Sequence, residues 1–360
     1  MWNDTETATN LHNGKSVPTV ALHKYMKHPI SPPSNRVYPL TTPRMPCVKV
    51  VDGLTTSIVA EFLDTAGKER FLAKAARFQA DLAQMEASQC LYQGIMGALG
   101  YSKNKTPFME LARRLPLQAL ESITQGKISD EESLARQQAV LLGTARLLPS
   151  QRPSWRHEDN EDKWIDILEG LWVSSRQTEA MSANAWHLFK VRPNNFPVRR
   201  LVAMSYLVHR YRQQGILEAV VNMINEVPMG NGYHILEKGL VVTTNGYWAS
   251  HFDFGFSHRL KTPTLLGVRR AADIAVNVLL PFAFAWGRAS SLPGLERKAL
   301  DLYCHYPRLV VNAVERHMKN QLGLDSRLVN SAQRQQGLIH IYNSLCTQGR
   351  CDSCQLGKAA

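Results

Sequence analysis

The stretch from Leu54 to Phe78, LTTSIVAEFLDTAGKERFLAKAARF, decides the class of the fold. Its apolar side chains recur at spacings near three and four residues, which is the period of an α-helix. Gly67 interrupts the pattern as a punctuating residue. We therefore expect a helical domain to begin here. The apolar positions are Ile58, Phe62, Phe71, Leu72, Ala75 and Phe78.

Helical signals continue along most of the remaining chain. Pro107 suits a first helical turn, Gly100 suits the end of the preceding helix, and the acidic run after Ser129 suits a helix start. This pattern predicts a mainly α fold, with an irregular loop and room for one hairpin between Gly230 and Phe256. The expected helices are residues 87–99, 107–115, 131–148, 164–172, 198–211, 216–224, 269–286, 296–303 and 309–318.

Composition also suggests how the chain divides. Residues 149–162 are polar and charged, so we interpret 151–163 as a linker between helical subdomains at 51–150 and 164–338. A cysteine-rich tail follows at 339–360. Residues 1–50 are rich in Pro, Thr, Ser and Asn and hold one strand-like stretch, 17–22, with no partner nearby. Because a lone strand makes no sheet, residues 1–50 are interpreted as the β remnant of a truncated N-terminal domain.

The charge of the chain points to anionic partners. Lys and Arg total 42 against 30 acidic residues, a net charge of +12, which favours nucleic acid or a phosphorylated ligand. Residues 1–6 lack the basic and apolar parts of a secretory signal, and the longest apolar run, 274–287, is too short to cross a bilayer. We expect a cytoplasmic protein without a membrane partner, in which this run forms a core helix kinked at Pro281.

Three cysteines near the C-terminus predict a metal site. Cys346, Cys351 and Cys354 have the spacing C-x4-C-x2-C, and a C-x2-C loop can place two sulfurs on adjacent corners of a tetrahedron. His340 is the nearest candidate for a fourth ligand, and Cys304 with His305 comes next. Zinc is the expected metal, with an iron–sulfur cluster as the alternative. The remaining alternative is a reduced tail whose thiols merely lie near each other.

A second candidate site lies in an arginine-rich segment. Between residues 180 and 217 there are six Lys or Arg residues and no acidic residue. Pro197 suits the first turn of a helix, which would place Arg199 and Arg200 near free backbone N–H groups, with Arg192 in the preceding turn. Such an arrangement can bind phosphate. The alternative is that these arginines pair with acidic residues between 158 and 169.

A weaker candidate for catalysis is the pair His251 and Asp253. In an extended segment they would share one face, and a carboxylate can orient a histidine base. An aromatic core edge with a satisfied histidine is the more common form of such a stretch. The sequence has no P-loop, Rossmann glycine pattern, nucleophile elbow or HExxH motif.

Several short segments resemble the bacterial domain of unknown function 2851 family. They are residues 98–101 (ALGY) with 104–108 (NKTPF), 111–116 (LARRLP), 192–197 (RPNNFP) and 350–354 (RCDSC). The resemblance implies an uncharacterised family and supplies no catalytic residues. It also implies a longer N-terminal β region ahead of residues 17–20, which we expect this chain to lack.

Together these features predict a protein that binds nucleic acid or a phosphate ligand and carries a structural metal site. By fold-level analogy it would be the helical part of a nuclease-like protein. One alternative is an enzyme that acts on a small anionic substrate near His251 and Asp253. The other is a plain interaction protein whose charge serves solubility.

Overall fold

The computed structural model describes residues 9–10, 16–17, 47, 53–123, 128–152, 163–174, 179–228, 230–257, 263–325 and 327–358. The chain divides into two compact units, Met1–Met45 and Pro46–Ala360. In the first unit, β1 (Thr9–Asn10) pairs antiparallel with β2 (Ser16–Val17). The expectation of an unpartnered strand is therefore wrong at Val17, which lies opposite Thr9. Residues 18–22 lie outside the described part.

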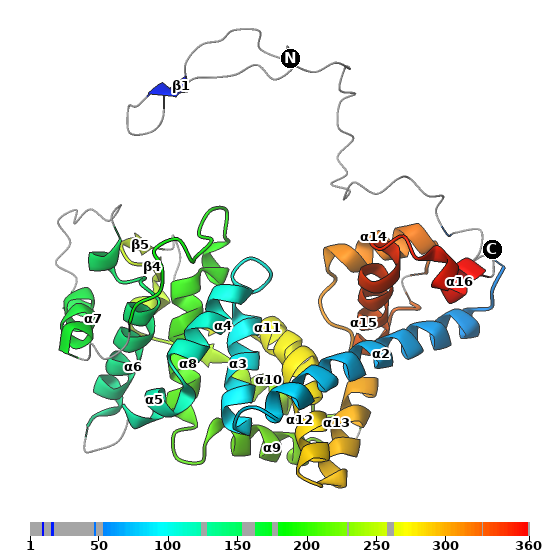
Figure 1. Ribbon diagram of the computed structural model, residues 1–360, viewed down its shortest axis with the longest axis horizontal. Coiled ribbons are helices and arrows are strands. Elements are labelled where there is room, and N and C mark those ends of the chain that lie inside the picture. The colour runs from blue at the N-terminus through cyan, green and yellow to red at the C-terminus, as the bar shows by residue number, and fades with distance from the viewer. Residues whose placement is uncertain are drawn as a thin grey trace. The chain divides into compact units, whose positions relative to one another are not determined.

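The second unit is mainly helical, as the sequence predicts (Figure 1). Its first helix begins after Thr55, whose side chain accepts a hydrogen bond from the backbone N–H of Ile58 at 3.4 Å. Ser129 caps another helix in the same way, through the N–H of Glu132 at 3.1 Å. The helices before residue 150 are α2 (Thr56–Leu82), α3 (Ala87–Leu99), α4 (Lys105–Arg114), α5 (Leu117–Ser122) and α6 (Asp130–Thr144).

The later helices include two short segments with the wider hydrogen bonding of a π-helix. These are η5 (Ala275–Leu279) and η6 (Tyr342–Cys346). The apolar run at 274–287 is thus helical throughout, and its irregularity is the π-segment before Pro281. The α-helices are α7 (Lys163–Ser174), α8 (Pro197–Arg210), α9 (Ile216–Glu226), α10 (His234–Leu240), α11 (Val268–Ile274), α12 (Leu280–Ala289), α13 (Pro293–His305), α14 (Ala313–Leu322), α15 (Ala332–Ile341) and α16 (Gln355–Lys358).

Four short strands lie between α10 and α11. The strands β4 (His251–Asp253) and β5 (Phe256–Ser257) form the one expected hairpin, whereas β3 (Val242–Thr243) pairs with β6 (Thr264–Leu266). Helix α10 lies in the stretch that we predicted to be an irregular loop. Single 3-10 turns are η2 (Pro149–Gln151), η3 (Pro193–Asn195), η4 (Tyr247–Ala249) and η7 (Cys351–Ser353).

The buried side chains form two clusters that do not follow the expected subdomains. The larger cluster, the main core, runs from Phe71 to Ala332 and includes both Leu148 and Trp172, from the two sides of the predicted linker. The smaller cluster, the C-terminal core, joins the start of α2 to α14, α15 and α16. Residues 153–162 of the predicted linker lie outside the described part. Helix α2 therefore contributes to both clusters.

Helix α2 packs along α15 at one end and against α12 further on (Figure 1). Two glycines make the first crossing close. A Cβ on Gly67 would lie 2.2 Å from the carbonyl oxygen of Gln333, and one on Gly337 would lie 2.2 Å from that of Leu63. Gly67 therefore allows close packing in the middle of α2, and the helix continues through this residue without interruption.

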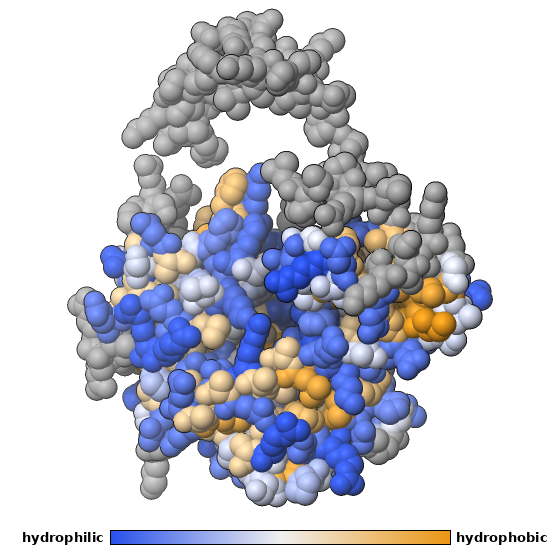
Figure 2. Space-filling model, turned by 45° about the vertical axis from the view of Figure 1, so that its right-hand side comes forward, coloured by the Kyte–Doolittle hydropathy of each residue, from blue (hydrophilic) through white to orange (hydrophobic). Residues whose placement is uncertain are grey.

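Most of the face in Figure 2 is hydrophilic, with smaller hydrophobic areas between the polar ones. Within the described residues, no helix has the length and apolar character that a membrane crossing requires.

Candidate anion-binding cavity

A cavity of about 510 Å³ opens beside α2 and is lined by side chains from α2, α3, α4, α11, η5 and α15. Its walls carry five cationic side chains against two carboxylates, those of Asp81 and Asp273. We call this hollow the cationic cavity. Its volume lies in the range of small-ligand sites. The five cationic residues are Arg70, Lys74, Arg77, Lys105 and Arg270.

Helix α2 supplies three of these cations. Arg70, Lys74 and Arg77 follow one another at spacings of four and three, which brings them to one side of the helix. Phe71 and Ala75 on the neighbouring side are buried and hold the helix against the main core. Like charges at such spacings repel each other, so the stripe weakens the helix unless an anion offsets it.

Lys74 is one of the cations that line the cationic cavity. Its ammonium donates to the side-chain oxygen of Asn277 and, at 3.3 Å, to that of Gln336. Arg70 donates to the same Gln336 oxygen at 2.8 Å. Burial, followed by the positive charges of Arg70, Lys105 and Arg77, holds the pKa of Lys74 well below its usual value. These two acceptors are neutral amides, so they accept hydrogen bonds from two of the three N–H groups of the ammonium without cancelling its charge.

The π-segment η5 positions Asn277. Its amide nitrogen donates to the backbone carbonyl of Asp273 at 2.8 Å, which turns the amide oxygen toward Lys74. A π-segment inside a helix often occurs at a functional site. Here it brings a polar side chain from an otherwise apolar run to the cavity wall.

The opposite wall is built around Tyr101. The guanidinium of Arg270 lies 3.7 Å from the centre of the Tyr101 ring, and Arg200 donates to the Tyr101 hydroxyl at 2.9 Å. Arg270 also donates to Asp273 at 3.3 Å. Burial raises the pKa of Asp273, and the charges of Arg270 and Lys74 oppose this shift. Tyr101 has a φ of +53°, a left-handed conformation that non-glycine residues adopt at a cost.

The three arginines predicted to bind an anion have different surroundings in the structure. Helix α8 begins at Pro197 as expected, but Arg199 is fully buried. Its guanidinium donates to the carbonyl oxygens of Trp248 at 2.5 Å and His251 at 2.8 Å. The two interactions tie α8 to η4 and to β4. An external anion would have to displace them.

Arg200 is also buried, whereas Arg192 is exposed in the turn where the sequence places it. Arg200 is buried and donates to the carbonyl oxygen of Leu265 at 2.7 Å and to the side chain of Asn195 at 2.9 Å. Arg192 is exposed ahead of η3. These hydrogen bonds of Arg199 and Arg200 have neutral acceptors, which are backbone carbonyls, the amide of Asn195 and the hydroxyl of Tyr101. The part of the acidic stretch 158–169 before residue 163 lies outside the described residues.

His251 and Asp253 have separate partners. Both carboxylate oxygens of Asp253 accept from Arg152, at 2.7 and 2.9 Å, and the two side chains are 4% and 13% exposed. Burial raises the pKa of Asp253, and the charge of Arg152 opposes that shift. His251 stacks on Tyr247 at 4.0 Å, and its Nδ1 lies 3.0 Å from the Tyr247 carbonyl oxygen. Asp253 is thus committed to Arg152 and does not orient His251.

The residues proposed for a metal are spread over two places. His340 faces α2, where its Nε2 lies 3.4 Å from Glu69. Burial lowers the pKa of His340, and Glu69 opposes this shift. Cys304 and His305 end α13, and Cys304 packs against the main core.

The tail cysteines lie at the other core. Cys346 and Cys354 pack against the C-terminal core, and Cys351 begins η7. All six cysteines of the chain are free thiols. In the described residues, no three His, Cys, Asp or Glu side chains are arranged as a ready metal site. Burial raises the pKa of Cys346 to about 12, with smaller contributions from Cys354, Cys47 and Cys351.

The residues of the cationic cavity were missed by sequence reasoning. The signal was the spacing of Arg70, Lys74 and Arg77, which lie among the apolar positions that define α2. Asn277 was visible only as a polar residue in an apolar run.

Comparison with known proteins identifies a family. The profile described as "Protein of unknown function (DUF2851)" matches residues 1–308. The match includes all five cations of the cavity and ends before α14 and the cysteine tail. Searches of curated proteins and of solved structures found no match.

Proposed function

The chain belongs to the DUF2851 family, whose function is unknown, and we propose that its cationic cavity binds a phosphorylated small molecule of nucleotide size. The observation that carries this proposal is Lys74, a partly buried cation surrounded by further cations and held by neutral amides. A bound phosphate would supply the negative charge that offsets their mutual repulsion. Charge-assisted hydrogen bonds from guanidinium and ammonium groups are strong in such partly buried sites.

The rest of the cavity wall suits the non-phosphate part of such a ligand. Phe78, Tyr101 and Met109 line it beside the cations. A flat base or another apolar group could pack on them, because ligand sites combine an apolar wall with a few polar groups that fix orientation.

Calorimetric titration with inorganic phosphate, pyrophosphate and adenosine monophosphate tests this proposal. Lys74→Gln and Arg77→Gln should each weaken binding about tenfold, since a charge-assisted hydrogen bond contributes about 1.5 kcal/mol or more. Arg113→Gln is the matched control, because Arg113 is exposed on α4 and does not line the cavity. Equal affinities for all four proteins would refute the proposal.

Binding of nucleic acid is a second candidate function, favoured by the net charge of +12. Its signature is salt dependence. Contact with several phosphates makes log K fall steeply with log[salt], at about 0.7 to 0.9 per phosphate contacted. An oligonucleotide titration with a steep slope that Lys74→Gln leaves unchanged would place nucleic acid outside the cationic cavity. A slope of log K against log[salt] that corresponds to about one phosphate, and that Lys74→Gln abolishes, would support binding in the cationic cavity.

A further inference from the structure

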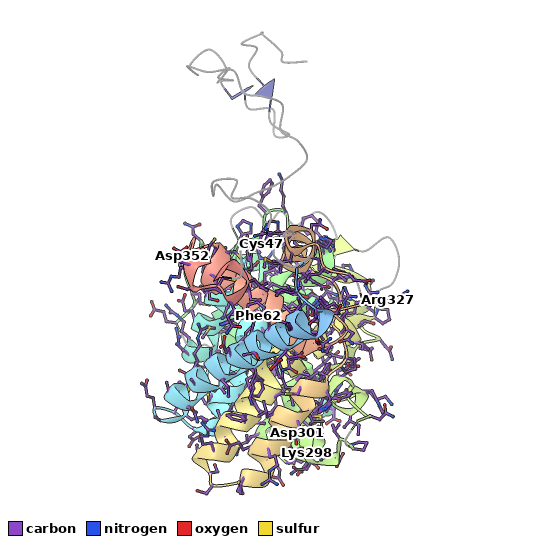
Figure 3. The ribbon with its side chains drawn as sticks, turned by 90° about the vertical axis from the view of Figure 1, so that its right-hand side faces the viewer. Cys47, Phe62, Lys298, Asp301, Arg327 and Asp352 are labelled. Atoms are coloured by element: carbon purple, nitrogen blue, oxygen red, sulfur yellow. The ribbon has the colours of Figure 1, made fainter. Side chains whose placement is uncertain are left out.

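A fourth cysteine joins the three of the tail. Cys47 lies far upstream in the sequence, yet it packs against the same C-terminal core as Cys346 and Cys354. The amide nitrogen of Gln321, on α14, is 4.0 Å from the Cys47 sulfur. Figure 3 shows Cys47 in the upper part of the helical unit, which also carries Asp352, the residue after Cys351.

The local fold gathers the three tail thiols. The π-segment η6 ends at Cys346, Gly349 turns the chain with a φ of +64°, and η7 then begins at Cys351. The N–H of Cys354 donates to the carbonyl oxygen of Cys351 at 3.0 Å, which closes the C-x2-C loop. The thiols of Cys354, Cys47 and Cys351 add to the burial that raises the pKa of Cys346. Four cysteines from two distant segments therefore lie at or beside the C-terminal core, all of them free and partly buried, although they are not yet arranged as a metal site.

We propose that Cys47, Cys346, Cys351 and Cys354 together bind one metal centre through four thiolates. Four cysteine sulfurs are the ligand set of a structural zinc site and of an iron–sulfur cluster. The two alternatives share the same ligands and differ in the metal. This assignment replaces His340 with Cys47 as the fourth ligand, because His340 is engaged with Glu69 on α2.

Binding would draw the thiols together, since Zn–S bonds are about 2.3 Å long. The turn at Gly349 can adjust, because nothing lies within 4 Å of the position where its Cβ would be. The thiols would lose their protons to become ligands, and the metal charge would stabilise the thiolates. The centre would then link the segment before α2 to the segment after α15, across the C-terminal core.

Metal analysis of the full chain, purified anaerobically with reductant, tests the proposal. The wild type should hold about one zinc per chain, or iron with sulfide and a brown colour, either of which supports the site. Cys47→Ser should lose the metal as fully as Cys354→Ser. His340→Gln and Cys304→Ser, the matched controls, should keep it. A wild type without metal, or a Cys47→Ser variant that keeps the metal while His340→Gln loses it, would overturn the proposal.

A second measurement distinguishes the loss of a metal ligand from the loss of metal through misfolding. Cobalt(II) is added to the metal-free wild type and to metal-free Cys47→Ser, after circular dichroism has shown that both are helical. Thiolate-to-cobalt charge-transfer absorption should be strongest for the wild type and should fall by about a quarter, or vanish, in Cys47→Ser because one of four ligands is missing. Equal absorption in the two proteins would remove Cys47 from the site.

Discussion

Lys74 shows how a single buried charge makes stability depend on pH. Its pKa is low in the folded protein, so between that pKa and the unfolded value of about 10.4 the unfolded chain binds more protons. Stability contributed by this residue therefore rises with pH across that window. It is lost as pH falls through the folded pKa, where the buried ammonium must be charged.

The expected outcome concerns Lys74→Met, which has no charge to bury. The free energy of unfolding of the variant minus that of the wild type should be largest at low pH. This difference should decline with rising pH, by at most about 1.4 kcal/mol per pH unit. Urea unfolding of both proteins across the neutral to alkaline range measures this difference. A difference that stays constant with pH would mean that folding does not shift the pKa of Lys74.

The buried pair of Arg152 and Asp253 allows a second residue-scale prediction. Removing one partner leaves an uncompensated charge in an almost dry site, so Arg152→Ala should lower the free energy of unfolding by about 3 kcal/mol. The double variant Arg152→Leu, Asp253→Leu should recover much of this loss, since no charge is left buried. Urea unfolding of the single and double variants decides it. A cost below about 1 kcal/mol for Arg152→Ala would show that the pair is solvated.

At the scale of elements, the crossing of α2 and α15 depends on two residues without side chains. Gly67→Ala would press a methyl group against the backbone of Gln333 and should cost about 1–3 kcal/mol. Gly170→Ala is the matched control, because Gly170 lies within α7 with nothing inside 4 Å, and it should stabilise the protein by up to about 1 kcal/mol. Thermal unfolding should therefore shift in opposite directions for the two variants. A stabilising Gly67→Ala would contradict the close crossing.

Which elements form could largely be predicted from local sequence. The cap at Ser129 and the proline in the first turn at Pro197 mark helix starts that the structure confirms. Helix α10 was not predicted, because it lies in the stretch that was interpreted as an irregular loop. The π-segments could not be predicted, because apolar periodicity does not encode a change in hydrogen-bond register. The role of Gly67 was equally hidden, since a glycine's neighbour across a helix crossing is set by tertiary packing.

At the scale of the whole molecule, sequence patterns show which faces are apolar and not what they pack against. This is why the expected boundary near 151–163 does not separate two cores, and why α2 belongs to both. The candidate site in the structure differs from the sites predicted from the sequence for the same reason. Arg199 and Arg200 were identified by charge, but both are buried and their guanidinium groups donate to neutral oxygens inside the protein. The cationic cavity needs side chains from six elements, and their convergence cannot be seen along the chain.

The position of α15 has a consequence for communication between the two ends of α2. Gln336 accepts from Arg70 and Lys74 in the cationic cavity, and its neighbour Gly337 meets Leu63 in the helix crossing. A ligand that fixes Gln336 therefore favours the same arrangement of α15 that the C-terminal core favours. Coupling free energy is reciprocal. A cofactor that stiffens the C-terminal core should therefore raise the affinity of the cavity for its ligand, and the ligand should raise the affinity for the cofactor by the same factor.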